Sequence, residues 1–544
     1  MAEQALAAYE SVRASVTSPA LKASFANSVH STQELDIDIL MRLHAEHPEL
    51  GYAARAFRAS ENSRAQSVID LLRETGTEIR RGVDEDLLVR ERHLESLIAR
   101  RAEEQTRLMR RAHEETESAA LVRQLDSLTN ELELVRGRIR ETSPQYAALR
   151  QPTALDLDEI QRQVLDDQTL LLEYSLGEEK SYLWAVTPST MECFDLPPRK
   201  QIEAALRRVR DRTIARNVTV PGESPQAQAN RILAADAGYM AAAKAASEML
   251  LGPVAQSLPN KRLLIVGDGA LLYLSFAALL DPQSANQPLP LVMNHEIVNT
   301  PSASLVSLLR QERNRTPADR TLAILADPVF TANDPRIASP STRGDSDGSP
   351  RTFVRLRFSR QEANAIAAMA PAKGTLKALD FDASRETVLK PGFGSYRIVH
   401  FATHSLLNDT HPELSGVVLS LVDRSGKPRN GFLRLYDIYN LRLGSNLVVL
   451  SACQTAIGHE TTGEGLNGLT RGFFYAGATS VVASLWAVDD RTTAELMTRF
   501  YDGILRHNEP ASAALRAAQI DLWKLKGWSA PYYWAAFTIQ GEWR

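Results

Sequence analysis

The chain has little of what marks a secreted, membrane-spanning or nucleic-acid-binding protein. Two cysteines, Cys193 and Cys453, occur in 544 residues, which excludes a disulfide framework and makes a reducing cytoplasm the expected location. No segment approaches the roughly 20 consecutive apolar residues that span a bilayer, and the first residues lack the charged and apolar parts of a signal peptide. The net charge is only −4, so neither nucleic acid nor an anionic membrane is expected as a main partner.

The composition is that of a soluble globular protein with more than one domain. Hydrophobic residues make up 44% of the chain and charged residues 24%, and both values are ordinary for globular proteins. The length exceeds that of one ordinary domain, so two or three are expected. No group of cysteines and histidines has the spacing of a metal site, and we expect neither metal nor cofactor.

Residues 1–150 have no convincing strand and are expected to be helical throughout. Apolar residues in residues 121–139 step alternately by four and three positions, between glutamates and arginines. This heptad pattern predicts a coiled coil or a long helical hairpin. A helix packed against its own domain is the alternative, because fewer than three full heptads are present. The residues of the pattern are Leu121, Leu125, Leu128, Leu132, Val135 and Ile139.

From about residue 155 onward, predicted strands alternate with predicted helices. Residues 169–175 and 181–187 form a strand pair joined by a turn at 177–180, and residues 262–270 and 321–328 are buried strands. Helices are expected at 201–216 and 226–251. This order predicts an α/β fold with a mainly parallel sheet flanked by helices, after an all-α N-terminal region.

A polar segment divides this α/β region in two. Residues 331–351 are rich in serine, proline, aspartate and arginine, so we expect a mobile surface loop. The domains predicted on this basis are a helical region at 1–150, an upstream half at 155–330, this loop, and a downstream half at 352–544. Arg336, Arg343 and Arg351 make the loop a candidate site of self-cleavage or regulation.

Two strands of the downstream half end in residues that could cooperate in catalysis. His404 closes the apolar run at 398–404, and Cys453 closes the run at 447–453. Such runs predict parallel strands buried on both faces, and functional groups gather at the carboxyl ends of these strands. An imidazole beside a thiol supplies the base and the nucleophile of a cysteine protease.

The segment that follows Cys453 could line a substrate site. Residues 454–468 are punctuated by glycines and feed a helix at 466–476, after which residues 479–486 predict another buried strand. Asp489 and Asp490 at its end could bind a cationic substrate side chain, or could cap the helix at 491–501. Glu464 could face substrate, or could hold its own loop by accepting backbone N–H bonds.

Five ordered motifs in this half resemble the CHAT domain, a caspase-like peptidase domain often found downstream of tetratricopeptide repeats. The resemblance runs from about residue 155 to the C-terminus, and residues 40–57 resemble the helical segment that links such repeats to CHAT domains. The upstream half would then be the non-catalytic, pseudo-caspase-like part of the domain. The motifs lie at residues 400–404, 450–455, 463–469, 476–490 and 532–537.

The resemblance to caspases and separase implies roles for several residues. His404 would be the general base and proton donor, and Cys453 the nucleophile. The backbone N–H groups of Cys453 and Ser405 would form the oxyanion hole, and Asp489 or Asp490 would bind a basic P1 side chain. Caspases usually have glycine where Ser405 stands. The caspase signature Gln-Ala-Cys-X-Gly reads Ser-Ala-Cys-Gln-Thr at residues 451–455, which is nearer to separase-type relatives.

Other histidines and the second cysteine have less specific interpretations. His400 shares a strand face with His404 but lies ~13 Å deeper along the strand, so we expect a buried, hydrogen-bonded structural residue. His459 is the alternative base, and Cys193 is expected to be an ordinary packed thiol.

The sequence as a whole predicts a cytoplasmic cysteine endopeptidase of the caspase-like class that cleaves protein substrates after a basic residue. A regulatory protein partner would bind the helical N-terminal region. The alternatives are a catalytically idle scaffold that assembles signalling complexes, and a cysteine-dependent transferase or other hydrolase on the same fold.

Overall fold

A computed structural model describes most of the chain, and its described residues fall into two compact units. The first unit comprises residues 1–154, 329–354 and 420–431, and the second comprises residues 155–328, 355–419 and 432–544. The described residues are 19–76, 84–108, 115–142, 154–284, 288–313, 318–337, 353–407, 415–451 and 464–544.

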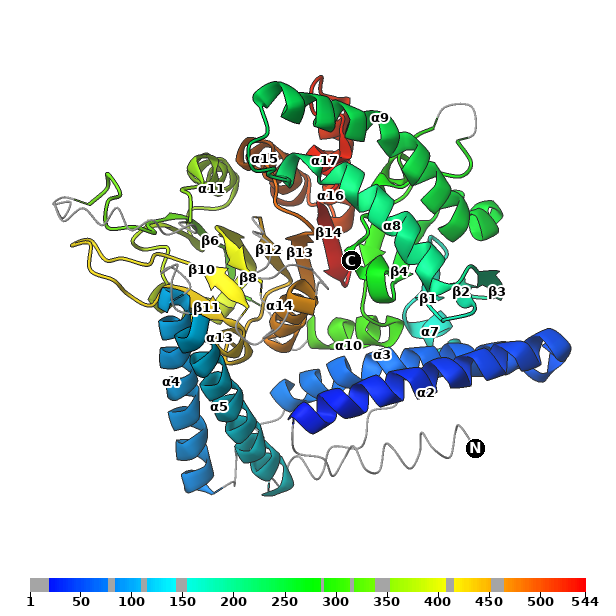
Figure 1. The fold of residues 1–544 in the computed structure, drawn as a ribbon, viewed down its shortest axis with the longest axis horizontal. Coiled ribbons are helices and arrows are strands. Elements are labelled where there is room, and N and C mark those ends of the chain that lie inside the picture. The colour runs from blue at the N-terminus through cyan, green and yellow to red at the C-terminus, as the bar shows by residue number, and fades with distance from the viewer. Residues whose placement is uncertain are drawn as a thin grey trace. The chain divides into compact units, whose positions relative to one another are not determined.

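The first unit is built mainly from pairs of long helices (Figure 1). Helix α2 packs on α3, and α4 packs on α5. An ion pair between Arg90 and Glu131 links α4 to α5 at 2.5 Å. Gly51, with φ of 72°, takes the left-handed conformation that the turn before α3 requires. The helices are α2 Pro19–Glu46, η1 Pro48–Leu50, α3 Tyr52–Gly76, α4 Glu85–Leu108 and α5 Glu115–Thr142.

The heptad pattern of residues 121–139 forms the buried face of α5. All six of its apolar residues are buried except Leu128, which is half-buried. Helix α5 packs on α4, and the choice between a coiled coil and a long helical hairpin remains a prediction. The stripe therefore stabilises a contact between helices, as its spacing requires.

Among the described residues of the second unit, eleven strands form one sheet in the order β3-β2-β1-β4-β5-β14-β13-β12-β8-β6-β7. The strands are β1 Thr169–Ser175, β2 Ser181–Val186, β3 Met191–Leu196, β4 Arg262–Val266, β5 Ile297–Asn299, β6 Arg320–Pro328, β7 Thr375–Asp380, β8 Tyr396–Ala402, β12 Leu447–Leu450, β13 Ser480–Ser484 and β14 Phe537–Gly541. A separate antiparallel sheet contains β9 Ser405–Leu406, β10 Gly416–Val418 and β11 Phe432–Arg434.

The large sheet consists of two parallel blocks that run in opposite directions. Strands β1, β4, β5 and β14 are parallel to one another, and so are β13, β12, β8, β6 and β7. The blocks meet where β13 pairs antiparallel with β14. The expected mainly parallel sheet is confirmed, and so is the antiparallel pairing of β1 with β2.

Several neighbouring strands of the sheet are not consecutive in the chain. Strand β6 precedes the polar segment 331–351 but lies between β7 and β8. Strand β14, at the C-terminal end of the sequence, lies beside β5 of the upstream half. The division into halves at 155–330 and 352–544 remains a prediction.

Helices flank the sheet, with α8 packed on α9, α11 on α15, and α15 on α16 (Figure 1). The helices are α7 Leu157–Gln163, α8 Arg199–Thr213, η2 Ala215–Asn217, α9 Pro225–Leu250, η3 Gly252–Ser257, η4 Gly269–Tyr273, η5 Phe276–Ala278, η6 Leu291–Met293, α10 Ala303–Arg313, α11 Arg357–Met369, α12 Arg385–Val388, η7 Phe393–Ser395, α13 Leu435–Tyr439, α14 Glu464–Tyr475, α15 Asp490–Arg506, α16 Ala511–Lys524 and α17 Pro531–Trp534.

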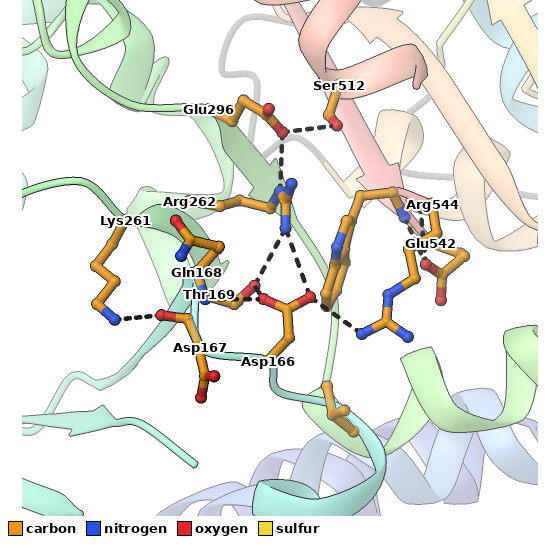
Figure 2. Close-up of polar contacts among 12 residues, drawn as sticks. Asp166, Asp167, Gln168, Thr169, Lys261, Arg262, Glu296, Ser512, Glu542 and Arg544 are labelled. Carbon is orange, nitrogen blue, oxygen red and sulfur yellow. Dashed lines mark hydrogen bonds and ion pairs between the residues drawn. The ribbon is translucent and has the colours of Figure 1, made fainter. Parts of the chain in front are cut away.

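Polar contacts hold the end of β14 in the middle of the sheet (Figure 2). The buried Glu542 pairs with Arg310 of α10, whose guanidinium lies 4.5 Å from the centre of the Trp543 ring. Arg544 donates to Asp166 at 3.0 Å. Arg–carboxylate pairs and cation–π contacts of this kind are strongest where water is partly excluded. They anchor the strand that joins the two parallel blocks.

Candidate functional site

His404 lies just beyond the carboxyl end of β8, where the small antiparallel sheet fixes its backbone. Its carbonyl accepts the Val418 N–H at 2.8 Å, and the hydroxyl of the preceding Thr403 donates to the Val418 carbonyl at 2.6 Å. Ser405 is buried and pairs with Val417 in β10. His404 itself is only 4% exposed. The sequence predicted its position at a strand end, and strand β10 explains how the segment is held.

The register of the sheet relates His404 to the strand that leads to Cys453. Leu450 of β12 pairs with Phe401 of β8, and the Ser451 N–H extends the pairing by donating to the Phe401 carbonyl at 3.0 Å. His404 and Cys453 each stand three positions beyond this pair in the sequence. Cys453 and His459 lie outside the described residues.

Asp489 performs the capping role that was one of its two expected functions. It is the N-cap of α15, and its side chain accepts the Thr492 N–H at 2.9 Å. An N-cap carboxylate satisfies one of the free N–H groups of the first turn and favours the positive end of the helix dipole. One oxygen of this carboxylate is therefore already engaged within its own helix.

Asp490 has a different environment on the same turn. Its carboxylate accepts the Phe358 N–H from α11 at 2.9 Å. The pKa of this carboxyl group is raised to about 6. Burial is the largest cause, the charges of Glu362, Asp489 and Asp327 act in the same direction, and the Phe358 N–H opposes them. A carboxyl group with this pKa is ionised at neutral pH and neutral in mild acid.

Asn217 holds the loop that carries these two carboxylates. The sequence did not indicate that Asn217 belongs to the site. Its side-chain N–H group donates to the Ala487 carbonyl at 2.9 Å, and its oxygen accepts the Tyr532 hydroxyl at 2.9 Å. The Trp486 indole N–H donates to the Tyr532 carbonyl at 3.1 Å. No local pattern could identify Asn217, because its partners lie 270 and 315 positions away in the sequence.

His400 is buried and hydrogen-bonded on both ring nitrogens, as expected. Nε2 lies 2.7 Å from Glu362 Oε1, and Nδ1 lies 3.0 Å from the Tyr501 hydroxyl. Burial, and then the charge of Glu362, raises the pKa of Tyr501 well above its usual value, so the phenol stays protonated. A carboxylate only accepts, so Nε2 donates to Glu362 and the phenol can donate to Nδ1. These bonds tie β8 to α11 and α15.

Two other candidate residues are Glu464 and Cys193, and in the described part of the chain the structure shows no contact of either with the residues described above. Glu464 is the first residue of α14, and its side chain lies outside the described residues. Cys193 is a half-buried free thiol on β3. Burial raises its pKa, and the charge of Asp195 adds to the effect. A thiol with a raised pKa is a poor nucleophile at neutral pH.

The family model of the CHAT domain matches residues 240–542. The chain belongs to the CHAT domain family. The match includes β8, β12 and β13, and with them His404, Cys453 and the two aspartates. The fold class expected from the resemblance, an α/β sheet after a helical region, is therefore confirmed by both the sheet and the family.

Curated relatives share only a short part of their length with this CHAT protein. Tetratricopeptide repeat protein 28 of Mus musculus is 39% identical over 114 residues, which are 21% of this chain and 5% of that protein. The protein of the same name from Homo sapiens is 36% identical over 106 residues, or 20% and 4%. The chain therefore corresponds to a small fraction of either relative.

Solved structures with a similar arrangement are distant in sequence. Two crystal structures of the Saccharomyces cerevisiae separase–securin complex align with TM-scores of 0.45 and 0.48, at 10% and 9% identity. They cover 96% and 95% of this chain, and 38% and 37% of the matched chain. The Arg-specific cysteine proteinase gingipain R aligns with a TM-score of 0.30 at 10% identity, over 63% of this chain and 74% of its own.

Two features are absent from the described residues of the CHAT protein. Within these ranges, no helix is long and apolar enough to cross a membrane. The same part of the chain contains no group of three or more His, Cys, Asp or Glu side chains that could hold a metal ion.

Proposed function

We propose that the chain is a cysteine endopeptidase in which His404 and Cys453 form the catalytic dyad. The supporting observation is the register of β8 and β12, in which Phe401 pairs with Leu450. In the sequence, His404 follows Phe401 by three positions and Cys453 follows Leu450 by three positions. Neighbouring strands lie ~4.8 Å apart. Two side chains at equal distances beyond neighbouring strand ends can therefore come within hydrogen-bond reach.

The mechanism follows from the chemistry of a thiol and an imidazole. His404 takes the proton of Cys453, and the thiolate attacks the carbonyl carbon of the scissile peptide. The backbone N–H groups of Cys453 and Ser405 stabilise the oxyanion. His404 then gives its proton to the leaving amine, and a water molecule activated by the same imidazole hydrolyses the acyl-enzyme. The bonds from Val418 and Thr403 give this segment the rigidity that the mechanism needs.

The same proposal includes a preference for a basic P1 side chain. Asp490 supports it, because a carboxylate with a pKa of about 6 is charged at neutral pH. Asp489, the N-cap of α15, places a second acidic side chain at the same turn. Glu464, at the start of α14, is a further candidate contact.

We further propose that a regulatory protein binds the helical first unit. Large apolar side chains are exposed on its helices, with Leu35 and Ile39 on α2, Val89 on α4 and Leu134 on α5. Exposed apolar groups on paired helices suit a protein partner. The relatives named for tetratricopeptide repeats are consistent with such an interaction.

Hydrolysis of a ladder of fluorogenic peptides tests this function. The peptides differ only in a P1 residue of Arg, Lys, Asp or Leu. We expect turnover of the Arg and Lys peptides by the wild-type chain and by Cys193→Ser, and none by Cys453→Ser or His404→Ala. Equal turnover by wild type and Cys453→Ser would refute the dyad. A preference for Asp or Leu would refute the basic P1 assignment and leave the dyad intact.

A further inference from the structure

A large pocket opens beside the carboxyl end of β13. Its volume is about 760 Å³, within the range of pockets that bind ligands. The walls come from α8, from the segment that follows β4, from α14, and from the two residues after β13. Among the described residues, four charged ones line it, namely Glu203, Arg207 and Arg210 of α8 and Arg471 of α14. We call this cavity the arginine pocket.

The sheet register relates the arginine pocket to the proposed dyad. Leu450 of β12 pairs with Phe401 on one side and with Ala483 of β13 on the other. Trp486 lines the pocket and follows Ala483 by three positions in the sequence. His404 follows Phe401, and Cys453 follows Leu450, by the same number of positions. Strand β13 is the next strand after β12, so the pocket opens one strand away from the strand that precedes Cys453 in the sequence.

The lining combines positive charge with apolar surface. Leu206, Val209 and Trp486 are buried and present apolar walls. Within the described part of the lining, three guanidinium groups and one carboxylate carry a net charge of +2 (three positive charges minus one negative). Guanidinium groups bind carboxylates through paired, charge-assisted hydrogen bonds.

We infer that the arginine pocket binds an acidic side chain of the polypeptide substrate. This inference rests on the proposed endopeptidase function. A substrate would then present a basic side chain to Asp490 and an acidic residue, with apolar neighbours, to the arginine pocket. The two charges of opposite sign would fix the direction and position of the peptide across the proposed dyad.

Binding of a matched pair of peptides tests this inference without any need for catalysis. Fluorescein-labelled Ala-Leu-Glu-Leu-Glu-Leu-Ala and its Gln-for-Glu counterpart are titrated against the full chain carrying Cys453→Ser, and fluorescence polarisation is measured at low ionic strength. We expect the Glu peptide to bind about fivefold more tightly or better, as charge-assisted hydrogen bonds predict. Equal affinity for the two peptides would overturn the inference.

Neighbouring charge reversals on α8 provide the control. Arg207 and the adjacent Arg208 are both exposed, but only Arg207 lines the pocket. We expect Arg207→Glu to abolish the preference for the Glu peptide, and Arg208→Glu to leave it unchanged. Equal loss in both variants would attribute the binding to general surface charge and overturn the inference. So would competition by free glutamate at the concentration of the peptide, because the pocket would then be a site for a small anion.

The outcomes separate this inference from the function on which it rests. Selective binding that depends on Arg207, in a chain that hydrolyses no peptide, would support the pocket and refute the peptidase. Hydrolysis of the arginyl peptides without selective binding would support the peptidase and refute the pocket.

Discussion

Replacing Asp490 with asparagine should change how the stability of the second unit depends on pH. The pKa of this carboxyl group is about 6 in the folded chain, against a usual value of 3.8 for aspartate. The folded state therefore binds its proton more tightly than the unfolded state does. It follows that ionising Asp490 opposes folding, and this group lowers the free energy of unfolding as the pH rises from about 4 to about 6.

The magnitude follows from the size of this difference and from the exposure of the group. A full unit of pKa difference corresponds to ~1.4 kcal/mol, but Asp490 is only partly buried, and solvent screening reduces the effect. We therefore expect about 1 kcal/mol of destabilisation above pH 6. Asparagine keeps an oxygen that can accept the Phe358 N–H and carries no charge beside Glu362 and Asp327.

Urea unfolding of wild type and Asp490→Asn at pH 4.5 and pH 7.5 measures this effect, followed by tryptophan fluorescence of the second unit. The variant should be more stable than wild type at pH 7.5, and the gain should shrink at pH 4.5. Asp502→Asn serves as the control, because Asp502 is a half-buried carboxylate on the same helix that pairs with Arg506 at 3.0 Å. A stability difference that is the same at both pH values, or larger at the lower one, would refute the reasoning.

Three further predictions concern contacts that the structure assigns. Tyr501→Phe removes the hydroxyl from the buried His400 and should cost about 1 to 3 kcal/mol of unfolding free energy, measured by urea denaturation, with little change in kcat. Asn217→Ala releases the Ala487 carbonyl and should raise KM for an arginyl peptide several-fold while changing kcat little. Leu125→Ala, at a residue only 1% exposed, should cost about 2 to 5 kcal/mol and lower the midpoint at which helical circular dichroism is lost.

Each of these predictions has an outcome that would contradict it. An unchanged unfolding midpoint for Tyr501→Phe would mean that the His400 bonds add nothing to stability. If Asn217→Ala lowered kcat and left KM unchanged, Asn217 would not be a positioning residue for the substrate loop. Wild-type helical stability of Leu125→Ala would mean that the stripe on α5 is not a packing face.

The elements that position the candidate site were predictable because each has a strong local signal. The apolar runs that become β8, β12 and β13 are continuous, as strands covered on both faces must be. The stepping of leucines on α5 has the period of a helix. The extent of the apolar run at 398–404 also predicted His404 at a strand end and His400 within the strand.

The remaining features depend on contacts between residues that are far apart in the chain. Asn217 acquires its function from Ala487 and Tyr532, which no local pattern connects to it. Strand β14 is five residues long and enters the middle of the sheet antiparallel to β13. The two roles of Asp489 and Asp490 could not be separated either, because the Phe358 N–H that binds Asp490 comes from a helix 132 positions away.

Covalent labelling tests the central claim, a dyad of His404 and Cys453, most directly. The wild-type chain and His404→Ala are incubated with an arginyl acyloxymethyl ketone, and the adducts are located by mass spectrometry. Cys193 is the internal control, because burial raises its pKa and lowers its reactivity. Circular dichroism of both proteins establishes that the variant is folded.

The proposed mechanism predicts an adduct on Cys453 in the wild type, at least tenfold less in His404→Ala, and none on Cys193 in either protein. Equal labelling of Cys453 in a folded His404→Ala chain would contradict it, because the thiol would then react without help from the imidazole. Labelling of Cys193 alone in the wild type would contradict it as well.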